Sequence, residues 1–412
     1  MSSYSYLALG EEIDREAYVV AKYRVTTDLP MEKAAEAIAA EQSTGTWTGI
    51  STLKDDVFDR YAGKVTSIDG DMVTLAFPVE DFSGRYGGVP QILSVIAGNL
   101  FGLGSVKGVR LEDVFFPDSF LRQYKGPKFG DEGMRNMLSR PEKPLVGTIV
   151  KPKVGLSPKD TAGYIYEAGI GGLTNGKDDE TLVDQTFCPI EERTKAVAEA
   201  LDRVDEEGGH MMHAINISSN ANDIVQLAED VQSWGARELM VDVLTSGFGA
   251  LQAVAEDPRI KVPVHVHRTM HAAITKDPYN GIAMCVFSKL VRMCGGDALH
   301  IGTLGVGKME GDVAGGRMSL EACRDTNVPF KTVMPVCSGG MYPGIVPAVM
   351  KVTGNDVQIQ AGGGVAGHPE GVRGGAMAMC QAADAAFEGI ALDEYAKTHK
   401  ELREALERWG SK

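Results

Sequence analysis

Two candidate metal ligands and a lysine stand together in the tetrapeptide Lys177-Asp178-Asp179-Glu180. If the tetrapeptide ends a strand, Lys177 and Asp179 share one face, and Glu180 can turn to the same side where the strand stops. Carboxylate oxygens of this kind suit Mg²⁺, which keeps several waters for a substrate. An ammonium cannot bind a hard cation, so Lys177 needs a further reason to be here, such as carbamylation to an oxygen donor. A solvated charged loop is the alternative.

A second group of candidate residues is the cationic pair in Lys151-Pro152-Lys153, where the proline stiffens the link between the two lysines. Two ammonium groups held close together favour loss of a proton from one of them, which suits a base or an electrophile near neutral pH. Two surface lysines are the alternative.

A glycine-rich stretch over residues 302–311 surrounds Lys308. It resembles a phosphate loop in composition but lacks the spacing and the Ser/Thr of a P-loop. Glycine hinges around one lysine suit a lid that closes over a substrate. A plain turn fits equally well.

Histidines and glycines supply a fourth group of candidates. His265, His267, Arg268 and His271 fall within one short segment, and His300 follows a later apolar run. Ser338-Gly339-Gly340 and Gly362-Gly363-Gly364 offer bare backbone N–H groups, which form a common phosphate site after the last two strands of a barrel. Zinc is disfavoured because Arg268 adjoins the histidines and because no Cys or third His stands at the spacing of a zinc ligand. Phosphate binding with proton transfer is favoured over the alternative of satisfied core histidines.

Composition limits the classes of protein that can hold these residues. The chain has 412 residues and a formal net charge of −15, so it has room for two domains and repels nucleic-acid phosphates. No signal pattern opens the sequence, and no apolar run reaches about 18 residues. We therefore expect a cytoplasmic protein with neither membrane nor nucleic-acid partners. Six scattered cysteines predict buried free thiols.

Eight short apolar runs predict the strands that must position the candidates. The runs are residues 145–150, 172–176, 211–217, 239–243, 262–267, 298–303, 332–336 and 357–360. Helical patterns or connections follow each run, which predicts a C-terminal (β/α)8 TIM barrel with its catalytic groups at the carboxyl ends of the strands. A doubly wound sheet would need fewer strands and a nucleotide fingerprint. The first third mixes strand and helix patterns, so we expect an N-terminal α+β (ferredoxin-like) domain over 1–133 and the barrel over 134–412.

The ordered motifs resemble the large subunit of ribulose-1,5-bisphosphate carboxylase/oxygenase (RuBisCO) over essentially the whole chain. They are residues 41–47, 98–102, 147–153, 171–180, 265–271, 302–311, 338–340 and 362–369. The stretch between Lys308 and Ser338 and the tail over 395–402 look most like the archaeal type III branch. Thr174-Asn175-Gly176 departs from the family pattern, and a glycine beside the modified lysine is expected to loosen its strand.

The resemblance implies carboxylation and oxygenation of ribulose 1,5-bisphosphate to 3-phosphoglycerate through a Mg²⁺-bound enediolate. Lys177 would be carbamylated by CO₂ to N6-carboxylysine and would hold Mg²⁺ with Asp179 and Glu180. The implied catalytic residues are Lys151, Lys153, His267, Lys308 and Glu41. The implied substrate-binding residues are Thr46, Trp47, Asn99, Arg268, His300, Ser338, Gly339, Gly340, Gly362 and Gly363.

The resemblance also implies how the chain assembles. Glu41, Thr46, Trp47 and Asn99 of the N-terminal domain would complete the barrel site of a partner subunit, giving a homodimer with shared active sites, further assembly being open. No small subunit is expected. The alternatives are a RuBisCO-like enolase or isomerase acting on another sugar phosphate, and a non-catalytic barrel.

Overall fold

The computed structural model describes residues 4–46, 48–306 and 313–411. The chain divides into two compact units. The first comprises Met1–Lys125, Met270–Met293 and Asn327–Pro329, and the second comprises Gly126–Thr269, Cys294–Thr326 and Phe330–Lys412. The fragment Met270–Met293 therefore interrupts the second unit along the sequence but belongs to the first.

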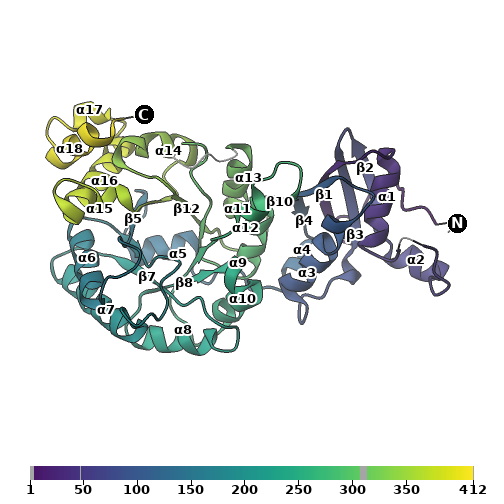
Figure 1. The fold of residues 1–412 in the computed structure, drawn as a ribbon, viewed down its shortest axis with the longest axis horizontal. Helices are drawn as coiled ribbons and strands as arrows, with labels where there is room; N and C mark the ends of the chain where they lie inside the picture. Colours follow the sequence, from purple (N-terminus) through teal and green to yellow (C-terminus); the bar gives the residue numbers. More distant parts are fainter. Residues whose placement is uncertain (1–3, 47, 307–312, 412) are drawn as a thin grey trace. The chain divides into compact units, whose positions relative to one another are not determined.

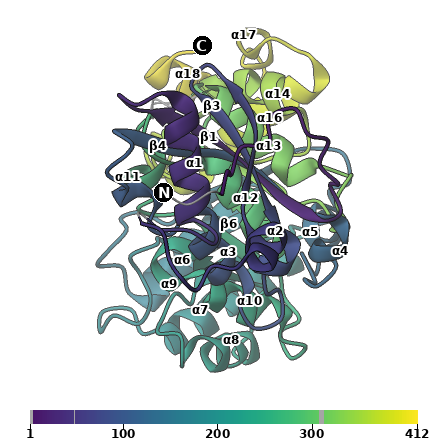
Figure 2. The same cartoon turned by 90° about the vertical axis from the view of Figure 1, so that its right-hand side faces the viewer.

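The first unit is built on a five-stranded sheet in the order β10-β4-β1-β3-β2 (Figures 1 and 2). Its strands are β1 (Tyr18–Thr26), β2 (Lys64–Asp69), β3 (Met72–Pro78), β4 (Gly108–Phe115) and β10 (Gly281–Ile282). Its helices are α1 (Met31–Glu41), α2 (Asp55–Tyr61), α3 (Gly88–Ala97), α4 (Asp118–Leu121), α11 (Ala272–Thr275) and α12 (Met284–Met293), with short 3-10 turns at Val79–Asp81 and Leu100–Gly102. Strands β1 to β4 with α1 and α3 follow the β-α-β-β-α-β order of the predicted ferredoxin-like domain.

Alternation explains why the first unit needs a helix layer. Strand β1 buries every second residue (Val19, Ala21, Tyr23 and Val25), the period of a sheet with one covered face. Helix α1 buries Ala34, Ala35, Ile38 and Ala39 and contacts β2.

The second unit is a closed barrel of eight parallel strands in the order β11-β12-β13-β5-β6-β7-β8-β9 (Figure 1). The strands are β5 (Leu145–Ile149), β6 (Asn175–Lys177), β7 (Met212–Asn216), β8 (Glu238–Asp242), β9 (Val264–His267), β11 (Ala298–His300), β12 (Met334–Ser338) and β13 (Gln358–Ala361). The helices are α5 (Gly130–Met137), α6 (Pro158–Ile170), α7 (Ile190–Glu206), α8 (Ile224–Ser233), α9 (Val243–Ser246), α10 (Phe248–Glu256), α13 (Val313–Arg324), α14 (Val346–Thr353), α15 (Gly363–Ala366), α16 (Gly371–Glu388), α17 (Leu392–Tyr395) and α18 (Lys400–Trp409), with a 3-10 turn at Pro343–Ile345.

The barrel strands are buried on both faces, as parallel strands under a layer of helices must be. Every residue of β7, β8 and β13 is buried. Met134 and Leu138, in and just after α5, join a hydrophobic cluster with the first residues of several strands, among them Leu145 and Met334. Packing at the amino ends of the strands leaves their carboxyl ends to carry polar groups.

The predicted barrel with an N-terminal α+β unit is confirmed, and each of the eight apolar runs overlaps a barrel strand. Some bounds differ: β6 begins at Asn175 and β12 ends at Ser338, both later along the chain than expected.

Candidate active site

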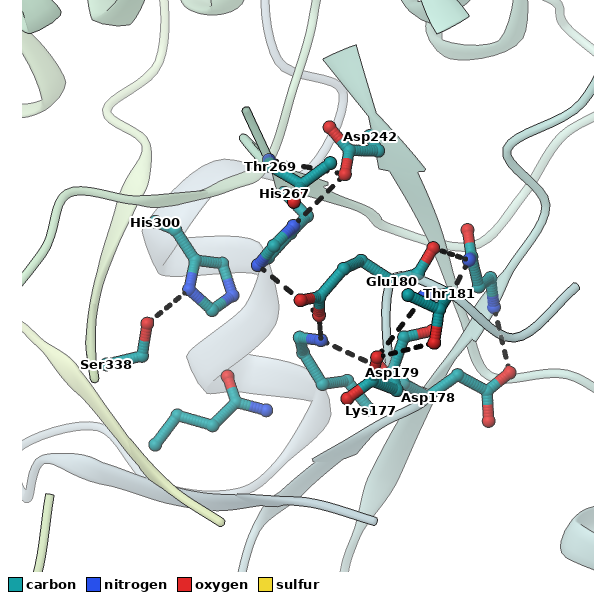
Figure 3. A network of polar contacts seen from close by, with 12 residues as sticks. Lys177, Asp178, Asp179, Glu180, Thr181, Asp242, His267, Thr269, His300 and Ser338 are labelled. Carbon is teal, nitrogen blue, oxygen red and sulfur yellow. Dashed lines mark hydrogen bonds and ion pairs between the residues drawn. The ribbon is translucent and has the colours of Figure 1, made fainter. Parts of the chain in front are cut away.

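Lys177 is the last residue of β6, and its side chain is fully buried. Its Nζ donates to the backbone oxygen of Asp178 at 2.7 Å and lies 3.6 Å from Glu180 Oε2 (Figure 3). Burial lowers the pKa of Lys177, although the nearby carboxylates act in the opposite direction. A lowered pKa increases the share of neutral amine, which is the form that can act as a nucleophile.

Asp179 and Lys151 form an ion pair between the ends of two neighbouring strands. Lys151 Nζ lies 2.8 Å from Asp179 Oδ2, and Thr181 Oγ1 donates to the other carboxylate oxygen at 2.9 Å. Burial raises the pKa of Asp179, but the hydrogen bond and charge of Lys151 outweigh burial and leave that pKa below its usual value. Asp179 is therefore an ionised oxygen donor at neutral pH.

Glu180 lies between the lysine and a histidine. Its Oε2 is 3.6 Å from Lys177 Nζ and 3.8 Å from His267 Nε2 (Figure 3). Burial raises the pKa of Glu180, but the positive charge of Lys177, and that of His267 when it is protonated, bring this pKa below the ordinary value. The structure thus brings together Lys151, Lys177, Asp179, Glu180 and His267 from the predicted set.

The donor chemistry of this cluster fits Mg²⁺, and an oxygen donor on Lys177 would improve the fit. Among the described residues, no three His, Cys, Asp or Glu side chains are grouped so as to hold a metal ion. Asp179 and Glu180 offer two carboxylates, and a carbamate on Lys177 would add a third anionic oxygen donor.

The remaining histidines form a chain of contacts inside the barrel. His267 Nδ1 lies 3.2 Å from Asp242 Oδ2, and His300 Nδ1 lies 2.6 Å from Ser338 Oγ (Figure 3). His265 Nε2 lies 2.7 Å from His300 Nε2. Burial lowers the pKa of His267 and takes that of His300 well below its ordinary value, His267 and His265 adding to the effect on His300. Both rings are therefore neutral at pH 7.

The predicted phosphate-binding residues of the barrel lie at the ends of four strands, β9, β11, β12 and β13. Arg268 directly follows β9 and is half-buried, and desolvation lowers its pKa to about 10, so it stays cationic. Ser338 ends β12, and Gly339 and Gly340 after it have φ of 107° and 71°, which side chains rarely adopt.

Gly362 lies close to Lys151. A Cβ on Gly362 would lie 3.1 Å from Lys151 Cε, so the bare backbone lets the Lys151 stem pass. Gly363 follows it as the first residue of α15. Lys153 lies in the exposed loop after β5, and the structure shows no contact that links it to the cluster.

The predicted residues of the first third belong to the first unit. Asn99 Nδ2 donates to Glu41 Oε1 at 3.3 Å, so these two lie together. Thr46 is exposed. Trp47 and Lys308 lie outside the described residues.

Sequence reasoning missed the anchor behind the cluster. Asp178 is fully buried and points away from its two neighbours, as alternation on a strand requires. Its Oδ2 lies 3.1 Å from Arg193 Nε and accepts from the backbone N–H of Asn216 at 3.0 Å, and its Oδ1 lies 3.0 Å from His213 Nε2. Burial raises the pKa of Asp178, but Arg193 and His213 outweigh it and bring the pKa to about 2.

Fold and strand-end cluster together define a (β/α)8-barrel enzyme with an added α+β unit. Residues 131–409 match the family of the ribulose bisphosphate carboxylase large chain, catalytic domain, and residues 10–120 match its N-terminal domain. The chain belongs to the RuBisCO large-chain family, whose enzymes are carbon–carbon lyases, and the predicted resemblance to the archaeal branch is confirmed.

Relatives match along nearly their full length. The ribulose bisphosphate carboxylase of Methanocaldococcus jannaschii is 41% identical, covering 92% of this chain and 94% of the relative. That of Thermococcus kodakarensis is 39% identical, covering 98% and 96%. Two solved structures are also similar, an octameric RuBisCO of Pyrococcus horikoshii OT3 (TM-score 0.93, 37% identity, covering 98% and 96%) and a dimeric archaeal RuBisCO of Hyperthermus butylicus (TM-score 0.88, 36% identity, covering 98% of each chain). In the part of the chain that the structure describes, no helix is long and apolar enough to cross a membrane.

Proposed function

We propose that this chain carboxylates ribulose 1,5-bisphosphate to 3-phosphoglycerate, with O₂ as a competing co-substrate. The proposal depends above all on one observation: the buried Lys177 lies beside Asp179 and Glu180 at the barrel mouth, with Lys151 Nζ 2.8 Å from Asp179. Membership of the RuBisCO family and the names of the relatives support the same activity.

Lys177 is the group we assign to activation by CO₂. The neutral amine attacks the carbon of CO₂, a C–N bond forms, one C=O electron pair moves to oxygen, and Nζ releases one proton to solvent. Burial supports this step because it lowers the pKa of Lys177. The resulting carbamate, with Asp179 and Glu180, would hold Mg²⁺. When bound, Mg²⁺ supplies positive charge where oxygen anions develop on the substrate.

Lys151 and His267 are the groups we assign to proton transfer. Lys151, once its Nζ has released a proton and become a neutral amine, would take the proton from C3 of the substrate and later return a proton to the product. Asp179 orients the Nζ of Lys151. His267 is neutral and oriented by Asp242, so it can accept a proton at neutral pH. Lys153 would assist from the loop after β5.

Two sets of residues would hold the two phosphates. Arg268, His300, Ser338 and Gly339 would form one site, where a cation and hydroxyl or backbone donors suit a phosphate. Gly340, Gly362 and Gly363, with Thr46 and Trp47, would form the other. Lys308 would close over the substrate with Glu41, and Asn99 would contact the carboxylated product of CO₂ addition.

We further propose a cytoplasmic homodimer whose subunits complete each other's active sites. Support comes from two solved relatives, which are described as octameric and dimeric. The proposal includes no small subunit.

One assay tests the activity. The protein is incubated with ribulose 1,5-bisphosphate, Mg²⁺ and labelled bicarbonate, and label is expected in 3-phosphoglycerate. Lys177→Met should lose the label, whereas the exposed Lys159→Met should keep it. Absence of label, with an enolised or isomerised product from another sugar phosphate, would refute the carboxylase and favour a RuBisCO-like enolase or isomerase.

A further inference from the structure

Gly176, the residue before Lys177, lies directly across from a buried histidine on the next strand. Strands β6 and β7 are parallel neighbours, and their register pairs Gly176 with His213. A Cβ on Gly176 would lie 2.7 Å from His213 Nδ1, closer than real Cβ contacts come. The other near atoms, Met211 Cε at 2.9 Å and Ile165 Cδ1 at 3.0 Å, end flexible side chains and can move. Position 176 is therefore a glycine because the His213 ring occupies the space beside it.

The His213 ring has one hydrogen-bond partner among the described residues. Its Nε2 lies 3.0 Å from Asp178 Oδ1, and its Nδ1 is buried without a partner. Asp178 is paired through its other oxygen with Arg193, so the carboxylate accepts and His213 Nε2–H donates. Through this one hydrogen bond from Nε2–H, the His213 ring connects β7 to the loop after β6.

Asp178 passes this constraint on to Lys177. Its backbone N–H donates to Ala214 O at 3.0 Å, and its backbone oxygen accepts from Lys177 Nζ at 2.7 Å. With one N–H tied to this carbonyl, rotation of the amine is restricted. The Asp178 carboxylate, held by His213 and Arg193, and the Asp178 carbonyl, which accepts from Nζ, belong to one residue, so loss of a carboxylate contact can be relayed to the acceptor that holds Nζ.

We infer that His213 is a positioning residue for CO₂ activation: through Asp178 it holds the amine of Lys177 in the orientation that reacts with CO₂. The inference rests on the proposed function, in which Lys177 forms a carbamate and releases one proton. Gly176 is needed for the same arrangement, because only a residue without a side chain leaves room for the His213 ring. The expected effect of losing His213 is a weaker affinity of Lys177 for activator CO₂, rather than a slower reaction once the carbamate has formed.

A double-mutant cycle tests the pair. ¹³C-labelled CO₂ is titrated into the full-length protein with saturating Mg²⁺, and the carbamate signal is measured by ¹³C NMR for wild type, His213→Ala, Gly176→Ala and the double variant. Each single variant should raise the CO₂ concentration for half-carbamylation about tenfold, the effect of one hydrogen bond to a charged group. In the His213→Ala background, Gly176→Ala should add less than about twofold, because the ring it displaces is gone. His210→Ala, an exposed histidine near the same strand, serves as the matched control.

Turnover of the carbamylated enzyme separates positioning from general damage. At saturating CO₂ and Mg²⁺ the catalytic rate should stay within about twofold of wild type. An unchanged CO₂ titration in His213→Ala, an equal effect of Gly176→Ala in both backgrounds, or an equal shift in His210→Ala overturns the inference. If His213→Ala does not fold, His213→Asn replaces it in the same cycle. Wild-type protein that forms no carbamate at any CO₂ concentration refutes the activation step of the proposed function itself, whereas a wild-type carbamate with unaffected variants refutes only the role of His213.

Discussion

Asp178→Asn removes the negative charge from a fully buried ion pair. The side chains of Asp178 and Arg193 both have 0% exposure, and Oδ2 lies 3.1 Å from Nε. Arg193 also donates to the backbone oxygens of Cys188 and Val183, both at 2.7 Å, so it cannot swing out to solvent without losing these bonds. Removing one partner of a buried pair costs about 3–5 kcal/mol. We expect the free energy of unfolding to fall by that amount at neutral pH.

The pH dependence gives an independent magnitude. The pKa of Asp178 is lowered from 3.8 to about 2 in the folded protein, a difference worth about 2 kcal/mol of stability. Because the folded pKa is the lower one, this contribution is complete above pH 3.8 and disappears as the pH falls toward 2. The expected loss for Asp178→Asn is larger than this pH-dependent contribution. The neutral side chain introduced by Asp178→Asn would leave the buried charge of Arg193 without a carboxylate partner, and the pKa difference of Asp178 does not include that cost.

Urea unfolding followed by circular dichroism measures the loss. Asp202→Asn is the matched control, since Asp202 lies on the same helix as Arg193 and pairs with Arg237 at 2.7 Å but is 73% exposed. An exposed pair of this kind is worth less than about 1 kcal/mol. If Asp178→Asn costs no more than Asp202→Asn at neutral pH, the anchor does not carry the stability we assign to it.

Three further outcomes are expected. Asp297→Ala should cost at least about 3 kcal/mol in urea unfolding, because it removes the acceptor of three backbone N–H donors, those of Phe129, Gly130 and Val264, the last two of them buried; a loss under about 1 kcal/mol would contradict this. Lys308→Ala should abolish carboxylation yet keep C3 proton exchange, measured by tritium release to water; loss of both would show that Lys308 acts before CO₂ is added. Because burial lowers the pKa of His267 below 6.5, the acid limb of the rate profile should lie below pH 6.5, and a limb above it would rule out neutral His267 as the base.

The barrel was predictable because its strands are buried on both faces and therefore appear as apolar runs. Strand β6 shows the limit of that signal. It consists of Asn175, Gly176 and Lys177, all buried and none apolar, and the predicted run stopped just before the lysine. Strand β10 was not predicted. It has only two residues and pairs with β4, which is far away in the sequence, so neither its length nor the residues beside it in the sequence indicate a strand.

The strand ends carried most of the predicted barrel cluster because parallel strands bring their carboxyl ends to one rim. Lys151, Lys177, Asp179, Glu180 and His267 are brought together there by the barrel. What the sequence could not reveal is which residues stand behind them. Arg193 and His213 lie on a helix and on another strand, and only the closed barrel brings both to Asp178.

Gly176 shows how the neighbouring strand can add a second explanation for one departure from a pattern. The expectation that a glycine would loosen the strand of Lys177 considered the backbone only, because glycine loses more entropy on ordering than other residues do. The structure adds the neighbouring strand, where His213 occupies the vacant space and hydrogen-bonds to Asp178. In the tetrapeptide Lys177-Asp178-Asp179-Glu180, three residues thus lie on the side of the proposed substrate. Only Asp178 faces the other way, toward Arg193 and His213. Gly176 and His213 are therefore best understood together, because the glycine leaves the space that the buried ring occupies.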